Sequence, residues 1–204
     1  MPHKGKLGDT VARDDISGRL IHFTKGTQDE AFGTLCTILQ EHRLIGGNDS
    51  IKGGYHCVCF SEASLASLKH GLVNPNNYSR YSQFGIMFGK NWIFEKGGRP
   101  VIYQPDAEYE ALCESHRWRH VRYEPIAEKP IDFTWEREWR IQVDELFFDP
   151  TVGVVVVPDE SWEERLIDTH EEEQDFQIQQ YTQVMEEILA IQYREPFNWR
   201  IDIC

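Results

Sequence analysis

Apolar and polar residues follow one another in short blocks that predict both strands and helices. Runs rich in β-branched and aromatic residues favour strands at residues 18–24, 55–60, 81–88, 100–104, 138–143 and 152–157. The last run is continuously apolar, which is typical of a strand buried on both faces. Apolar residues recur at helical spacing between the first two strands, at Ala31, Phe32, Leu35, Ile38 and Leu39. Residues 29–43 are therefore expected to form an amphipathic helix that ends before Gly46.

Further helical segments separate the later strands. We expect a helical turn at residues 91–96, a helix at residues 106–119, and a short helix that begins near Ser61 and continues to Leu68. Strands and helices do not alternate strictly, and neither a GxGxxG nor a GxxxxGK[ST] loop is present. The pattern predicts an α+β fold.

The length and composition favour one domain. The chain has 204 residues, of which 40% are hydrophobic, enough for one substantial core. We divide it into a polar lead-in (1–17), an α+β core (18–158) and an acidic helical C-terminal segment (159–204). No apolar run approaches 18 residues and no signal peptide is evident, so we expect a cytoplasmic protein without a membrane partner. The five cysteines lack framework spacing and are expected to be free thiols.

The net charge of −13 is concentrated in one late segment. From residue 159 to residue 187 there are eleven acidic residues and one base, Arg165, which gives −10. Apolar residues also recur there at intervals of three and four, as in amphipathic helices. Residues 159–188 therefore form either a solvated acidic helix face or a surface that covers a basic partner.

The most informative stretch for chemistry is residues 132–141. If a strand begins near Glu138, alternation places Glu136, Glu138 and Arg140 on one side. Two neighbouring carboxylates suit acid–base work, because one of them tends to have a raised pKa, and an ionised carboxylate can hold a ribose hydroxyl. The alternative is an exposed edge strand whose Glu–Arg pairs each stabilise the fold by less than about 1 kcal/mol.

Short polar or aromatic groups also punctuate the ends of the predicted strands. They are His22, Thr24, Tyr81, Ser82 and Tyr103, together with the two glutamates. A cleft lined by strand ends is a common place for a ligand. A single histidine in an apolar strand can equally be a hydrogen-bonded core residue.

Metal and nucleic-acid sites have weaker signals. Cys57 and Cys59 are two apart, and Cys113, His116 and His120 would share a helix face, but the two groups are distant and lack CxxC spacing, so no metal site is expected. A separate acid-free stretch interleaves arginines with aromatics, as single-strand binders do, at Arg117, Trp118, Arg119 and Arg122. Pairing of this stretch with the acidic segment is the alternative.

Several motifs together resemble one known family. They are LIHFT (20–24), VCFSE (58–62), YSQFGIMFGKNW (81–92), GRPVIY (98–103) and EREWR (136–140). This order is similar to that of the AbiGi-like family of abortive phage-resistance proteins over residues 18–157. More distantly, it resembles the DarT-type ADP-ribosyltransferases, in which a first-strand histidine and a glutamate opening a late strand bracket NAD.

The more distant resemblance implies an ADP-ribosyltransferase-like split β core with NAD as substrate. It implies that His22, with Thr24 beside it, contacts the NAD ribose and that Glu138 is the catalytic glutamate. Glu136 would orient the acceptor, and Tyr81 or Tyr103 would stack on the nicotinamide. A carboxylate near the ribose 2′-hydroxyl stabilises the oxocarbenium-like centre formed when the glycosidic bond breaks.

Three functional hypotheses follow. The first is an NAD-dependent ADP-ribosyltransferase or NAD glycohydrolase in phage defence or a toxin–antitoxin pair. The second, suggested by the AbiGi resemblance, is a non-catalytic antitoxin or regulator that uses residues 159–188 to cover a basic partner. The third is a nuclease-like effector in which Asp132, Glu136 and Glu138 hold a divalent metal.

Overall fold

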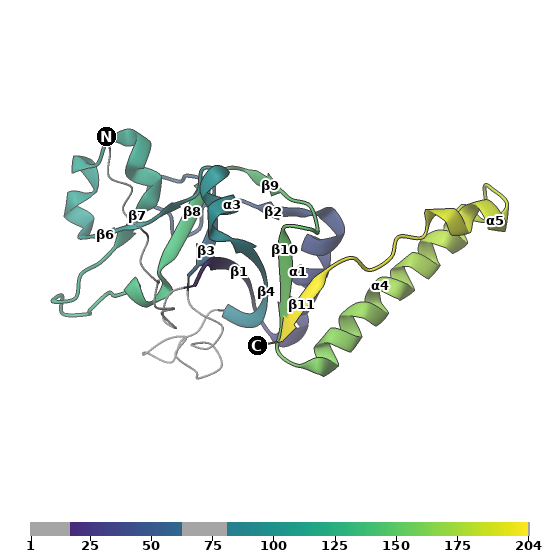
Figure 1. Ribbon diagram of the computed structural model, residues 1–204. Coiled ribbons are helices and arrows are strands. Elements are labelled where there is room, and N and C mark those ends of the chain that lie inside the picture. Colours follow the sequence, from purple (N-terminus) through teal and green to yellow (C-terminus); the bar gives the residue numbers. More distant parts are fainter. Residues whose placement is uncertain (1–16, 63–80, 204) are drawn as a thin grey trace, which may run out of the picture.

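The computed structural model describes residues 17–62 and 81–203 and has an α+β fold, with helices flanking a mostly antiparallel sheet (Figure 1). The main sheet contains, in spatial order, β11 (Arg200–Ile203), β10 (Gly153–Val157), β4 (Tyr81–Gly89), β1 (Arg19–Lys25), β3 (Cys57–Ser61), β8 (Glu138–Gln142) and β5 (Arg99–Pro100). All neighbours are antiparallel except β10 and β11, which are parallel. The predicted fold class is therefore confirmed at this level.

Two small sheets extend the main one. The short strand β2 (Arg43–Ile45) pairs antiparallel with β9 (Glu145–Phe147). In the second sheet, β6 (Ile102–Gln104) pairs parallel with β7 (His120–Arg122). The predicted strand at 100–104 is thus divided between two sheets, because β5 adds to β8 while β6 turns toward β7.

The helix α1 (Gln28–Glu41) covers one face of the main sheet. Thr27 caps its N-terminus, and the Glu30 side chain returns to the Thr27 N–H in a capping box. The helix buries the five residues that the spacing predicted, Ala31, Phe32, Leu35, Ile38 and Leu39. The helix ends at Glu41, earlier than predicted, because His42 takes a left-handed conformation as its C-cap. The strand β2, which the sequence pattern did not predict, begins directly afterwards at Arg43.

The two faces of the sheet carry separate apolar clusters. Leu20, Phe60 and Phe84 belong to the larger cluster, which α1 covers. Alternate residues such as Ile21 and Met87 belong to a smaller cluster on the opposite face. All five residues of β10 are buried, as its continuous apolar run predicted.

The segment at 106–119 is not one α-helix. It forms two 3-10 helices, η1 (Asp106–Ala111) and η2 (Glu114–Arg119). A further 3-10 turn, η3 (Thr134–Glu136), precedes β8. The expected helical turn at 91–96 is present as α3 (Lys90–Glu95). The helix expected from Ser61 to Leu68 falls largely on residues 63–80, outside the described residues.

The acidic segment forms an arm that projects from the body (Figure 1). Its outward limb is α4 (Glu160–Tyr181), and α5 (Glu187–Ala190) and η4 (Ile191–Tyr193) lie at the far end. The chain then returns to the sheet as β11, a strand inside the segment that we expected to be helical. Among the described helices, none combines the length and the apolar character that crossing a bilayer requires.

Candidate functional site

Glu138 and Arg140 form a buried ion pair on β8. The Arg140 Nε donates to Glu138 Oε1 at 2.7 Å, and Nη2 donates to Oε2 at 3.2 Å. The two side chains retain only 6% and 11% of their exposed area, for arginine and glutamate respectively. Arg140 Nη1 also donates to the carbonyls of Trp118 and His120, at 3.0 Å each. The carboxylate predicted to be catalytic is therefore held by a guanidinium that is itself fixed in place.

Other groups surround this pair. The backbone N–H of Glu138 donates to the Tyr103 hydroxyl at 3.0 Å. Burial raises the pKa of Tyr103, and the Glu138 and Glu136 carboxylates raise it further. Burial likewise raises the pKa of the Cys59 thiol, an effect that Glu138 increases. These groups are therefore protonated at neutral pH, and Cys59 is not an activated nucleophile.

Glu136 does not belong to the same strand as Glu138. It lies in η3, and Arg137 follows in the left-handed region with φ of 46°. The alternation that we expected to join the two glutamates therefore begins only at Glu138. The Glu136 carbonyl accepts a hydrogen bond from Ser61 Oγ at 2.7 Å, which ties η3 to the end of β3.

His22 lies in the same sheet but on the other face. Ile21 pairs with Ser61, which in turn pairs with Glu138. Directly paired residues point to one face and neighbours along a strand to opposite faces, so His22 points away from the Glu138 side. Its Nδ1 lies 2.8 Å from the Cys59 carbonyl oxygen, to which it can donate. Burial lowers the pKa of this histidine.

The remaining residues predicted to contact NAD lie in two separate groups. Thr24 and Ser82 lie together: their hydroxyls are 3.0 Å apart and donate to the carbonyls of Phe84 and Thr24, respectively. Tyr103 is beside Glu138, and Tyr81 lies on β4 with a side chain outside the described part. The structure thus assembles a Glu138–Tyr103 group and a Thr24–Ser82 group, and it does not bring His22 and Glu138 into one cleft.

The arginines of the predicted basic patch contact residues close to them in the sequence or on the strand β5. Arg117 pairs with Glu110, Arg122 pairs with Glu124, and Arg119 Nε donates to the Pro100 carbonyl. The alternative pairing of this patch with the acidic segment is therefore not observed among the described residues.

The cysteines and histidines weighed as possible metal ligands in the sequence do not form a cluster among the described residues. Cys113 and His116 are exposed, whereas His120 is buried on β7. Within residues 17–62 and 81–203, no three histidine, cysteine, aspartate or glutamate side chains are grouped to hold a metal.

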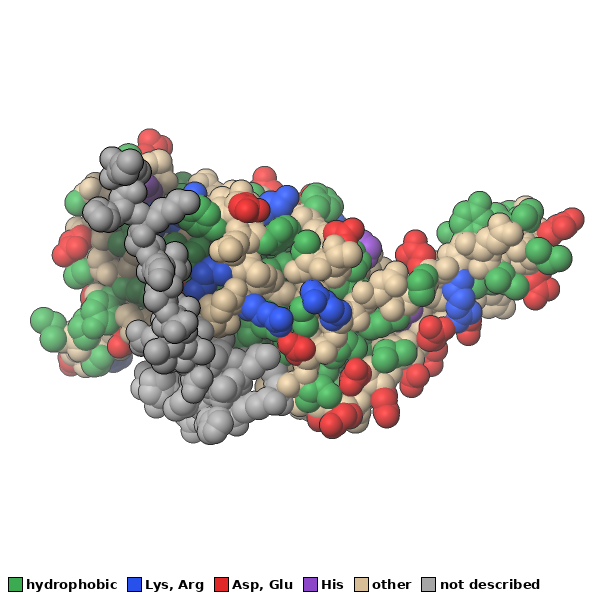
Figure 2. Space-filling model, in the orientation of Figure 1, with side chains coloured by type: hydrophobic (Ala, Val, Ile, Leu, Met, Phe, Trp, Pro, Cys, Tyr) green, Lys and Arg blue, Asp and Glu red, His purple; other side chains and the backbone are tan. Residues whose placement is uncertain are grey.

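The arm has the opposite character to the β8 region. Arg194, on the returning limb, pairs with Glu171 and Asp175 on α4, and the rings of Tyr181 and Tyr193 lie 5.3 Å apart. These contacts fasten the two limbs together. Large apolar side chains nevertheless remain exposed toward the end of the arm: Phe176, Tyr181, Val184, Ile188, Leu189, Ile191 and Tyr193. Figure 2 shows apolar and acidic side chains side by side on this arm.

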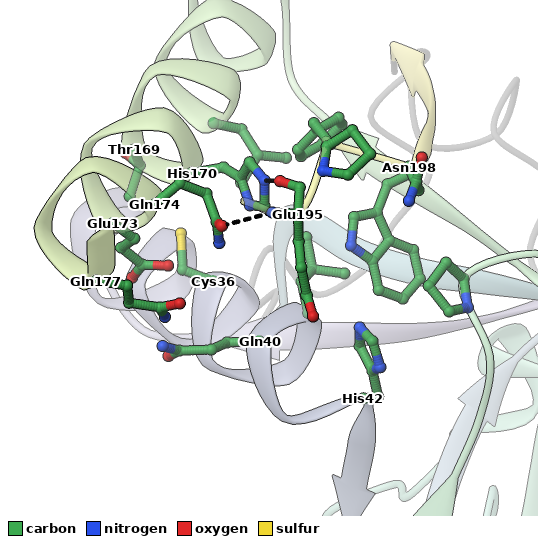
Figure 3. Close-up of a pocket in the computed structure, with 16 residues that line it drawn as sticks. Cys36, Gln40, His42, Thr169, His170, Glu173, Gln174, Gln177, Glu195 and Asn198 are labelled. Atoms are coloured by element: carbon green, nitrogen blue, oxygen red, sulfur yellow. Dashed lines mark hydrogen bonds between the residues drawn. The ribbon is translucent and has the colours of Figure 1, made fainter. Parts of the chain in front are cut away.

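A pocket of about 300 Å³ lies where the arm joins the body (Figure 3). Its walls come from α1, α4 and residues 195–199. Gln174 Oε1 accepts a hydrogen bond from the N–H of Glu195 at 2.8 Å, and His170 Nε2 lies 2.9 Å from the Glu195 carbonyl oxygen. These two contacts hold the returning chain against α4 and shape the pocket.

Comparisons with known proteins identify no relative of this chain. No protein-family model, no curated protein and no solved structure matches this chain. The functional argument therefore rests on the residues and their geometry.

The sequence reasoning missed the pocket and the return of the chain. Trp199 lines the pocket and precedes β11 directly, but its ring contacts His42 and Phe148, which are more than 50 positions away in the sequence. The apolar residues of the arm were visible as a helical pattern. That pattern favours a buried face, and only the fold reveals that they project beyond the body.

Proposed function

We propose that the protein is a binding module that covers a basic partner protein with its C-terminal arm, in the abortive-infection setting that the family resemblance implies. The observation that carries the proposal is the exposure of large apolar side chains at the end of the arm. Val184 and Ile188 are 80% and 75% exposed. Such residues on a projecting element mark interaction surfaces, because leaving them in water forgoes the free energy of burial.

The charge of the arm indicates the chemistry of the partner. Of its eleven acidic residues, only Glu171 and Asp175 pair with a base among the described residues, and Asp159 caps α4. The others have no ion pair within the described chain: Glu160, Glu163, Glu164, Asp168, Glu172, Glu173, Glu186 and Glu187. This surface attracts a basic partner and repels a second copy of the same acidic chain.

Site-specific photocrosslinking tests this proposal. A photoreactive amino acid would replace Ile188 in the full chain, and Ile126, which is 99% exposed on the body, provides the matched control. In extracts of the native host, we expect the Ile188 probe to crosslink one basic protein that the Ile126 probe does not. Raising the salt concentration before illumination should reduce that crosslink, because screening weakens charge attraction.

Three outcomes would contradict the proposal. One is the absence of any crosslink specific to the arm, and another is a crosslinked protein that is acidic. The third is a crosslink to a second copy of this chain, which would make the arm a self-association element.

We propose NAD-dependent ADP-ribosyl transfer as a second candidate. The observation that favours it is the gathering of Glu138, Tyr103 and Glu136 near the start of β8. The resemblance implies a catalytic glutamate opening a late strand, and an ADP-ribosyltransferase-like split β core with His22 on its first strand. In this candidate Arg140 releases Glu138 when NAD binds, and the freed carboxylate stabilises the oxocarbenium-like ribose.

Nicotinamide release from NAD distinguishes the second candidate from the first. Transfer chemistry would be supported if the purified protein releases nicotinamide and if Glu138→Gln lowers the rate of release by at least about 100-fold. The control is Glu145→Gln, on an exposed pair with Arg43. A wild-type protein without NAD binding or turnover, with candidate protein and nucleic-acid acceptors supplied, would exclude it.

A further inference from the structure

The pocket at the base of the arm brings polar and aromatic residues together around one hollow. It lies between α1, α4 and residues 195–199, and its volume of about 300 Å³ is at the small end of the range for ligand pockets. None of the 16 residues that line it is lysine or arginine, and its basic side chains are two histidines, His42 and His170. His170 Nε2 already faces the Glu195 carbonyl, and Glu173 and Glu195 contribute carboxylates. The lining therefore disfavours a phosphate or a carboxylate and accepts an uncharged ligand.

Gln174 supplies a hydrogen-bond donor without an acceptor. The residue is only 6% exposed, and its Oε1 is occupied by the Glu195 N–H. Among the described residues none accepts a hydrogen bond from its amide nitrogen, and the single fully enclosed, unpartnered side-chain nitrogen is His120 Nε2. The Gln174 amide nitrogen therefore keeps access to the pocket, toward which Figure 3 shows the side chain pointing. A buried amide of this kind favours a ligand with an acceptor.

Neighbouring groups complete a donor–acceptor pattern. The Glu173 carboxylate accepts hydrogen bonds, and the Gln40 and Gln177 amides can both donate and accept. The aromatic residues Phe197 and Trp199 also line the pocket. A flat ring with an acceptor beside an N–H donor satisfies all these groups at once, because it can use its edge for the amides and its face for the aromatics.

We propose that this pocket binds an uncharged nucleobase, as the free base or the nucleoside, and rejects the corresponding nucleotide. The base edge accepts from the Gln174 amide and donates to Glu173. A 5′-phosphate would bring negative charge toward a lining with two carboxylates and no lysine or arginine to receive it. This site lies at the base of the arm, away from its exposed apolar end and from the Glu138 region, and it shares Glu173 with the acidic surface proposed to bind the partner.

Calorimetry and ligand-observed NMR with the full chain test the proposal. The probes are adenosine, guanosine, cytidine and uridine, each beside its 5′-monophosphate. We expect at least one nucleoside to bind with a Kd below about 1 mM, and its monophosphate to bind at least about tenfold more weakly. Gln174→Leu should weaken nucleoside binding by at least about tenfold, whereas Gln180→Leu, an exposed position on the same helix outside the lining, should not change it.

A second variant guards against a folding defect. Gln174→Leu also removes the contact to Glu195, so Gln40→Trp, at an exposed lining position, fills the pocket without touching that hydrogen bond. It should abolish nucleoside binding and leave the melting temperature unchanged. The proposal is overturned if no nucleoside binds with a Kd below about 1 mM, if a monophosphate binds as tightly as its nucleoside, or if Gln40→Trp binds like the wild type.

Discussion

The β8 region and the arm both contain several charged side chains, but these are paired with one another at β8 and mostly unpaired on the arm. At β8 the Glu138 carboxylate faces a guanidinium that also holds two backbone carbonyls, so the charges are satisfied inside the fold. On the arm most carboxylates have no basic neighbour in the described chain, and exposed apolar side chains lie among them. A buried ion pair whose charges are neutralised within the fold is a structural element. An exposed surface that combines unpaired carboxylates with large apolar side chains has the features of an interaction surface. The exposed end of the arm is therefore a stronger candidate for a binding surface than the buried EREWR motif.

The largest expected effect comes from breaking the β8 pair. Arg140→Met leaves a carboxylate buried without its cation and removes two hydrogen bonds to carbonyls, so the free energy of unfolding should fall by about 3–5 kcal/mol. Arg122→Met, which breaks an exposed pair with Glu124, should cost less than about 1 kcal/mol. Urea unfolding measures both, and equal losses would show that the β8 pair is not a structural element.

An intermediate effect is expected from pH. Burial keeps the folded-state pKa of His22 below the ordinary 6.5, so the unfolded chain binds the proton more readily than the folded one. The stabilising contribution of neutral His22 is fully present above pH 6.5 and is lost as the pH falls from there toward the folded-state pKa. Unfolding curves at pH 7.5, 6.0 and 5.0 should show His22→Gln losing less stability over this range than the wild type. An identical decline in both proteins would refute this role, and the exposed His56→Gln serves as the control.

The smallest expected effect concerns the clamp within the arm. Arg194→Ala removes exposed ion pairs to Glu171 and Asp175, so the global free energy of unfolding should change by less than about 1 kcal/mol. Hydrogen exchange at the end of the arm should nevertheless become faster, because the two limbs lose their link. Unchanged exchange in residues 176–193 would show that the limbs are held by other contacts.

Local features of the sequence predicted much of the fold. The five buried residues of α1 follow from helical spacing, and the burial of β10 follows from its uninterrupted apolar run. Both signals depend on neighbours within a few positions, where the pattern is complete in the sequence itself. The single helix predicted at 106–119 is instead two short 3-10 helices, η1 and η2, which are separated by Leu112 and Cys113.

The candidate site was harder to predict because it depends on register. The face on which His22 points is fixed by the pairing of Ile21 with Ser61, 40 positions later, and of Ser61 with Glu138. A shift of one residue in either pairing would reverse the result. β11 likewise acquires its place only by pairing with β10 across the whole arm.

The central claim is that the end of the arm binds a basic partner. The most direct test uses the partner protein identified by crosslinking at Ile188 and measures its Kd for three forms of this chain. These are the wild type, Ile188→Ser on the arm and Ile126→Ser on the body, and each variant replaces one exposed isoleucine. The account predicts that Ile188→Ser weakens binding by at least about tenfold, while Ile126→Ser binds like the wild type. Equal affinities for the two variants would contradict it.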